Sequence, residues 1–125
     1  MTRINVGVHP SELPSKLLLA EHYEMIRIPN AIIAMRVNLS KPIPVDFTLG
    51  PGHVRFFYNK IKFLHHRYTE IQIECQCRDF IITHEDTSFK VVKEIYPELY
   101  NDYTPGPLDR EIIIDRIESK GFTLL

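Results

Sequence analysis

An apolar stripe that runs from Val54 to Cys75 constrains the fold of this chain more than any other feature. Its members are three or four residues apart, which is the repeat of one face of an α-helix. Gly50-Pro51-Gly52-His53 stands at its head and favours a helix start. The stripe therefore predicts a long helix from this point that forms the core, with these apolar members: Val54, Phe57, Tyr58, Ile61, Leu64, Tyr68, Ile71 and Cys75.

The other faces of this predicted helix concentrate positive charge over about four turns. The residues concerned are Arg55, Lys60, Lys62, His65, His66 and Arg67. A solvated helix face is the ordinary interpretation of such a run, and a nucleic-acid surface is the alternative. The glycines at the helix start add a weak second sign, because free N–H groups at a helix start can cradle a phosphate.

Shorter patterns predict helices on both sides of the central one. Ser11, followed by Glu12 and Pro14, predicts the N-cap and first turn of a helix. Val91 to Ile95 predicts one more short helix. The last helix is expected from about Leu108 to Lys120, with Leu108, Ile112, Ile113 and Ile117 inward and Arg110, Arg116 and Lys120 outside.

Two proline-bearing stretches, 30–47 and 96–107, predict connections between these helices, although 31–37 could form a short apolar helix. We therefore expect an all-α fold: a compact single domain, residues 1–125, of three main helices with long ordered connections. With 125 residues, of which 44% are hydrophobic, the chain can bury a core without metal or disulfide support.

Charge and cysteine content exclude several classes of protein. Fifteen Lys and Arg against sixteen Asp and Glu give a net charge of −1, which argues against nucleic-acid binding by bulk positive charge. Cys75 and Cys77 diverge by roughly 200° on a helix, so they cannot share a metal ion or a disulfide. We expect no metal and no cofactor. No apolar run could span a bilayer and no signal peptide is recognisable, so a soluble, cytoplasmic protein is expected.

Glu24 stands out on the first predicted helix. Leu13, Leu17 and Ala20 fall on one side at helical spacing, and the next position on that stripe is Glu24. A carboxylate that continues an apolar stripe is partly desolvated unless a cation pairs with it, and Arg27 is one turn away. An ordinary surface ion pair at a helix end is the alternative interpretation.

Three blocks of the sequence, taken together, resemble the pyrimidine-dimer DNA glycosylase family of phage endonucleases that repair ultraviolet damage. The first block is Met1-Thr2-Arg3-Ile4-Asn5. The second is Ser11-Glu12-Leu13 with Leu19-Ala20-Glu21-His22-Tyr23-Glu24 and Arg27. The third runs from Leu49-Gly50-Pro51-Gly52-His53 to Lys60, and weaker matches continue to Arg116 and Lys120. The resemblance covers nearly the whole chain and implies a single domain of three main helices.

The resemblance also implies a reaction. The nucleophile would be the α-amino group of Thr2 after loss of Met1, because an α-amine titrates near about 8 and is far less protonated at neutral pH than a lysine. It would attack C1′ of the damaged nucleotide and displace the base, and β-elimination from the resulting imine would cut the strand. Glu24 matches the catalytic glutamate, which stabilises positive charge on the sugar and moves protons.

The implied partner is double-stranded DNA that carries a lesion, with cyclobutane pyrimidine dimers as the expected damage. The DNA-binding residues that the resemblance implies are Arg3, Arg27, Tyr23, His53, Lys60, Arg116 and Lys120. Tyr23 stands where the family has an arginine, so that contact is expected to be lost or remade as stacking. A monomer is expected, in the bacterial cytoplasm or nucleoid if the chain is phage-encoded.

Two other functions remain open at this level. The same chemistry could act on a different damaged or modified base, because the departures from the family pattern fall in recognition elements. Alternatively, the fold could serve as a non-catalytic module that binds DNA or protein, in which Glu24 and Arg27 form a structural pair.

Overall fold

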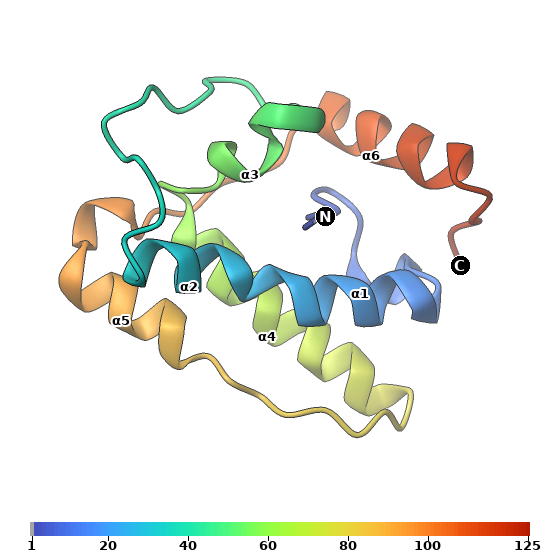
Figure 1. The fold of residues 1–125 in the computed structure, drawn as a ribbon. Coiled ribbons are helices and arrows are strands. Elements are labelled where there is room, and N and C mark those ends of the chain that lie inside the picture. The colour runs from blue at the N-terminus through green and yellow to red at the C-terminus, as the bar shows by residue number, and fades with distance from the viewer. Residues whose placement is uncertain (1) are drawn as a thin grey trace.

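Helices form all the regular secondary structure of residues 2–125, the part of the chain that the computed structural model describes (Figure 1). They are α1 (Ser15–Met25), α2 (Arg27–Ile33), α3 (His53–Phe56), α4 (Ile61–Cys77), α5 (Thr87–Ile95) and α6 (Pro107–Ser119), with 3₁₀ turns at Pro10–Glu12, Gly50–Gly52 and Pro97–Leu99. The predicted all-α class is confirmed. The three longest helices, α1, α4 and α6, agree with the three main helices that were expected.

The central helix begins later than the apolar stripe predicts. A turn at residues 57–60 separates α3 from α4, and in it the amides of Phe57 and Lys60 donate to carbonyls three residues back. In a continuous helix the neighbours Phe56 and Phe57 would point about 100° apart. The turn instead lets both rings enter one buried aromatic cluster with Phe47. Packing of these rings therefore overrides the helical period.

The first helix also begins later than predicted. Ser11 is not its N-cap: residues 10–12 form a 3₁₀ turn, and α1 begins at Ser15 after the N-cap Pro14. Leu13 has extended backbone, with ψ 132°, because a residue that precedes proline is driven out of the helical region. The proline that was expected in the first turn therefore delays the helix.

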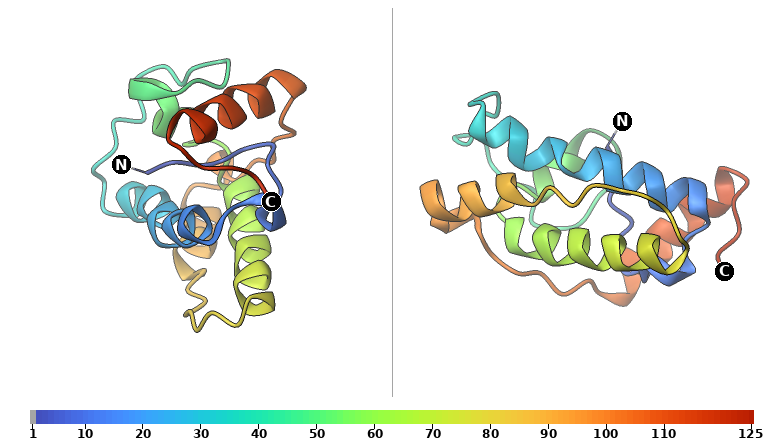
Figure 2. Two further views of the ribbon diagram at one scale, coloured as in Figure 1. Left: turned by 90° about the vertical axis from the view of Figure 1, so that its right-hand side faces the viewer. Right: turned by 90° about the horizontal axis from the view of Figure 1, so that it is seen from below.

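Figures 1 and 2 show α6 on one side of the molecule and the remaining long helices on the other. On that second side, α1 packs on α4, α2 packs on α5, and α4 packs on α5. The N-terminal segment, residues 2–8, contains a turn at residues 6–7 and runs between α1 and α6 (Figure 2). Its apolar side chains are part of the core, which includes Ile4, Val6, Val8, Leu18, Met25, Leu64, Ile71, Ile113 and Ile117.

Gly7 allows this segment to turn beneath α6. Its φ of +74° lies in the left-handed region that side chains disfavour. A Cβ at this position would also come within 2.9 Å of the Cβ of Arg110. The close approach brings the backbone of α6 against the segment and Ile113 and Ile117 into the core, while the Arg110 side chain stays 40% exposed. Leu108, two residues before Arg110, then points to the opposite side and is 65% exposed, so its predicted inward position is wrong.

The short apolar helix considered at 31–37 lies earlier in the chain, as α2, so the connection predicted at 30–47 begins only after Ile33. Pro29 permits this because it lies in the first turn of α2, where no intrahelical N–H bond is lost. The short helix expected at 91–95 is the second half of α5. Cys75 is buried and Cys77 is exposed, as their spacing on a helix requires.

None of the helices described is both long and apolar enough to cross a membrane. Within residues 2–125, no group of three or more His, Cys, Asp or Glu side chains is placed to hold a metal ion.

Candidate active-site cleft

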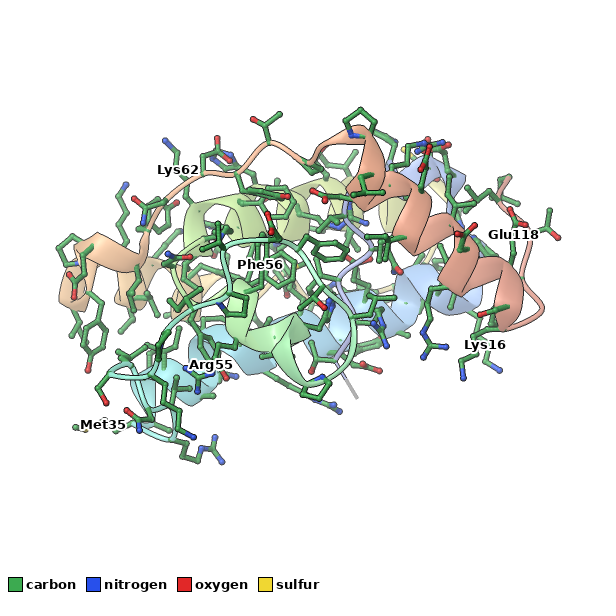
Figure 3. The ribbon with its side chains drawn as sticks, turned by 90° about the horizontal axis from the view of Figure 1, so that it is seen from above. Lys16, Met35, Arg55, Phe56, Lys62 and Glu118 are labelled. Carbon is green, nitrogen blue, oxygen red and sulfur yellow. The ribbon has the colours of Figure 1, made fainter. Side chains whose placement is uncertain are left out.

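A cleft of about 290 Å³ lies between α1 and α6. Figure 3 shows one end of this arrangement, where Lys16 on the first turn of α1 and Glu118 on the last turn of α6 lie at the same end of the molecule. The apolar part of the lining is Leu17, Ala20, Ile117 and Phe122. The polar part is Arg3, Asn5, Glu21, Glu24, Arg116 and Lys120.

Glu24 reaches this cleft from the stripe that singled it out in the sequence. Leu17, Ala20 and Glu24 all line the cleft, whereas Leu18 and Met25, on a different face of α1, enter the core. The stripe on α1 therefore faces a partly open cleft and not the interior. Glu24 is half-buried there, as a carboxylate among apolar neighbours should be.

Three cationic side chains from two segments share the cleft with Glu24. Arg3 comes from the N-terminal segment, and Arg116 and Lys120 come from successive turns of one face of α6. Burial lowers the pKa of Arg3, the positive charge of Arg116 lowers it further, and Glu24 opposes this decrease. The predicted residues Arg3, Glu24 and Arg116 thus form one electrostatic group, and Lys120 lines the same cleft.

Thr2 is the predicted nucleophile, and its side chain and backbone are 8% exposed. It directly precedes Arg3 and so stands next to the cleft in the chain. Met1, whose removal the predicted chemistry requires, lies outside the described residues.

A buried polar cluster lies behind the cleft and consists of Asn5, Glu21, His53 and Arg67. Glu21 Oε1 accepts from Asn5 Nδ2 at 2.8 Å, from the Asn5 amide at 3.3 Å and from Arg67 Nη2 at 3.0 Å. Its Oε2 accepts from Arg67 Nε, so the carboxylate and the guanidinium pair through two bonds. Arg67 Nη1 also donates to the carbonyl of Val8 at 2.9 Å.

The sequence interpretation missed this cluster. Arg67 was assigned to the positive outer face of the central helix, yet it is buried. A signal was present, because Arg67 is three residues after Leu64 and four before Ile71, both core residues. Glu21 has the same relation to Leu18 and Met25 on α1. An acid and a base at core spacing on two helices indicate a buried pair.

His53 does not lie at the surface, where a contact with the DNA backbone would require it to be. It is 1% exposed, and both of its ring nitrogens have partners. Nε2 accepts from the Ile4 amide at 2.9 Å, so Nδ1 carries the hydrogen and donates to the Thr48 carbonyl at 3.0 Å. Burial lowers the pKa of His53 to about 4, so the ring is neutral. The structure therefore makes His53 an anchor for the N-terminal segment.

Three other predicted DNA contacts lie outside the cleft: Tyr23, Lys60 and Arg27. Tyr23 is 60% exposed and borders a separate hollow with His22 and Tyr68 on the other side of α1. Lys60 donates to the Phe56 carbonyl and to Asn59 Oδ1, both at 2.9 Å.

Arg27 is exposed at the first position of α2. The salt bridges of residues 2–125 do not include one between Arg27 and Glu24. The predicted pair is therefore not made: Glu24 lines the cleft, whereas Arg27 is exposed at the start of the next helix.

A sequence-family model described as pyrimidine dimer DNA glycosylase matches residues 1–88 of this chain. The match spans the N-terminal segment, α1 to α4 and the first residues of α5. It therefore includes the buried polar cluster together with Arg3 and Glu24. Arg116 and Lys120, on and directly after α6, lie beyond the matched part.

Proposed function

This chain belongs to the pyrimidine dimer DNA glycosylase family, and from that premise we propose that it removes a damaged pyrimidine through an imine on the amine of Thr2 and then cuts the strand as an abasic-site lyase. The family assignment makes the chain a DNA repair glycosylase that acts on DNA. The proposal adds the nucleophile, the second reaction and the lesion, which is the cyclobutane pyrimidine dimer.

The observation that carries the proposal is the meeting of Glu24 with Arg3 in one cleft, because Arg3 is the residue that follows Thr2 in the chain. In the proposed reaction the Thr2 nitrogen bonds to C1′, and the glycosidic bond breaks with its electron pair leaving on the base, which takes up a proton. The sugar ring opens to give an iminium. Loss of a C2′ proton then expels the 3′ phosphate, and water releases the amine from the unsaturated aldehyde.

Glu24 has two roles in this sequence. Its negative charge stabilises the positive charge that develops on the sugar and on the iminium. Its carboxylate also takes and returns protons during imine formation and elimination, which is the work of a general acid and base. A partly desolvated site strengthens both effects, because charges interact more strongly where water is excluded.

The cations of the cleft hold the DNA strand in this proposal. Arg3, Arg116 and Lys120 would contact phosphates on either side of the lesion. Such contacts give affinity that falls with salt concentration. The net charge of −1 is compatible with this role because the positive side chains gather at one place.

Borohydride trapping on an oligonucleotide with one abasic site tests the proposal. Chain prepared without Met1 should form a covalent complex with the DNA after reduction, and N-terminal sequencing of that sample should begin at Thr2. The matched control is a chain with one extra residue before Thr2, which has no free amine at that position. Absence of a covalent complex with the Met1-free chain would overturn the proposal.

The lesion is tested separately. Duplexes that carry a cyclobutane dimer, another ultraviolet photoproduct or an oxidised pyrimidine should be compared for cleavage at equal enzyme concentration. We expect the dimer to be cut fastest. Faster cleavage of another lesion would keep the chemistry and change the substrate.

A further inference from the structure

Side chains from four helices hold the N-terminal segment by its backbone. His53 of α3 accepts the amide hydrogen of Ile4, and Glu21 of α1 accepts that of Asn5. Farther along, Arg110 of α6 donates to the Gly7 carbonyl at 2.8 Å and Arg67 of α4 donates to the Val8 carbonyl. A segment outside any sheet has no neighbouring strand to pair with its backbone, so these bonds, together with the buried side chains of Ile4, Val6 and Val8, determine where it lies.

The bonds nearest to Thr2 are made by groups that are costly to bury. Glu21 and Arg67 are charged and buried, and a well-packed apolar pair of similar volume is often as stable as a buried ion pair. Packing alone therefore gives no reason for an ion pair at this position. What the pair adds is direction, because a carboxylate that bonds both the amide and the side chain of Asn5 fixes the register of the segment.

The length of free chain before the first anchor sets how far the amine of Thr2 can move. The Ile4 amide is two residues from Thr2, and an extended chain spans about 3.3 to 3.6 Å per residue, so the amine stays within about 7 Å of that point. Without the bonds at Ile4 and Asn5, the next backbone bond to a helix side chain is at Gly7, and the upper bound on the reach grows to about 17 Å, which the buried side chains of Ile4 and Val6 shorten. Chemistry at C1′ requires reacting atoms about 3 to 3.5 Å apart.

We propose that His53, Glu21 and Arg67 are positioning residues for the nucleophile: by holding Ile4 and Asn5 they deliver the amine of Thr2 to the cleft that Arg3 and Glu24 line. The inference rests on the proposed function, because it assigns a task only if that amine reacts. Asn5 and Glu21 belong to the buried polar cluster and also line the cleft. A shift of the cluster therefore changes the shape of the cleft.

His53 offers the sharpest test. His53→Ala removes the acceptor for the Ile4 amide, whereas His53→Gln keeps an acceptor at the position of Nε2. In single-turnover borohydride trapping on abasic DNA, we expect His53→Ala to lower the maximal rate by about 10- to 100-fold, with the DNA concentration at half-maximal rate changed by less than about threefold. His53→Gln should recover most of the rate.

Arg110→Gln is the matched control. It removes a bond to the same segment and the ion pair with Glu12, yet leaves the anchors at Ile4 and Asn5 in place. It should lower thermal stability and leave the maximal trapping rate within about threefold. If Arg110→Gln lowered the maximal trapping rate as much as His53→Ala does, general destabilisation would explain both results and the inference would be overturned.

The intrinsic reactivity of the amine separates positioning from chemistry. Reductive alkylation of Thr2 with propanal, followed by mass spectrometry, should proceed equally fast in the wild-type and His53→Ala chains, because a small aldehyde needs no fixed geometry. If His53→Ala lowered the rate of reaction with propanal as much as the rate of trapping on DNA, the inference would be overturned.

Failure of the wild-type chain to trap DNA would remove the proposed function, and this inference with it. Failure of the inference alone is a folded His53→Ala chain that traps as fast as the wild type. If His53→Ala does not fold, Asn5→Ala replaces it, because that change removes one bond to Glu21 and leaves the pair with Arg67 intact. The Asn5→Ala chain should then trap several-fold more slowly than the wild type, and an unchanged rate would overturn the inference.

Discussion

Two carboxylates one turn apart on α1 occupy opposite environments. Glu21 is buried and bonds to Asn5 and Arg67, whereas Glu24 is half-buried and lines the open cleft. The arginines differ in the same way: Arg67 is enclosed, and Arg116 faces the cleft. The same residue types thus build a rigid support in one region and a group available to a substrate in the other. Burial and bonding, not residue type, separate the two regions.

The largest effect is expected when the open carboxylate is removed. Glu24→Gln should lower the rate of the proposed trapping reaction by about 10² to 10⁴-fold, because a general acid and base contributes that much. Its melting temperature should stay close to that of the wild type, since a substitution at a partly open site changes stability by about 0.5 kcal/mol or less. Full activity of Glu24→Gln would show that the cleft is not the reaction site.

Removal of the enclosed cation should affect stability. Arg67→Met leaves Glu21 as a buried charge without its partner, and we expect a loss of about 3 to 5 kcal/mol in the free energy of unfolding, measured by urea denaturation. The double variant Glu21→Leu/Arg67→Met removes both charges and should regain most of that loss. If the double variant were no more stable than Arg67→Met, the unpaired charge of Glu21 would not be the cause of the lost stability.

Acid should weaken the buried region through His53. The pKa of His53 is lowered by burial from 6.5 to about 4, so the unfolded chain takes up this proton first as the pH falls. The stability from neutral His53 is complete above about pH 6.5, falls between 6.5 and 4, and changes no further below 4, with a total of about 3 kcal/mol. Burial also lowers the pKa of His22, which adds to the same loss.

The His53→Gln chain isolates the contribution of His53, because glutamine does not titrate. Its unfolding free energy, measured by urea denaturation from pH 4 to 7, should fall less steeply with acid than that of the wild type. Parallel curves for the two chains would contradict the assignment to His53.

The smallest effects are expected for single cations of the cleft. Lys120→Gln should weaken binding to duplex DNA a few-fold and reduce the slope of log affinity against log salt by about 0.9, the contribution of one phosphate contact. Lys62→Gln, on α4 and outside the cleft, is the control and should leave that slope unchanged (Figure 3). Equal slopes for Lys120→Gln and wild type would place the phosphate contacts elsewhere.

Local patterns predicted much of the fold and singled out Glu24 in the open region, whereas Arg3, Arg116 and Lys120 were expected there only from the family resemblance. The stripe that ends in Cys75 located α4, and the position of Glu24 on a second stripe was enough to mark it as unusual. The interruption at residues 57–60 was not predictable in this way, because it depends on the rings of Phe47 and Phe57 meeting in three dimensions.

The buried region was predicted less well, for a physical reason. The partners Glu21 and Arg67 are 46 residues apart, and no local pattern states that two helices place them together. His53 was expected from the family resemblance to contact DNA, whereas its partner is the buried amide of Ile4. A charged or polar residue that shares the spacing of a core stripe is the clue that the interpretation overlooked.

The anchors of the N-terminal segment also order events during synthesis. Its partners follow 16, 49, 59 and 103 residues later in the chain, in Glu21, His53, Arg67 and Arg110. At a translation rate of about 5 to 20 residues per second, roughly 5 to 20 seconds pass between synthesis of the segment and addition of Arg110. Until then the segment lacks its full set of contacts.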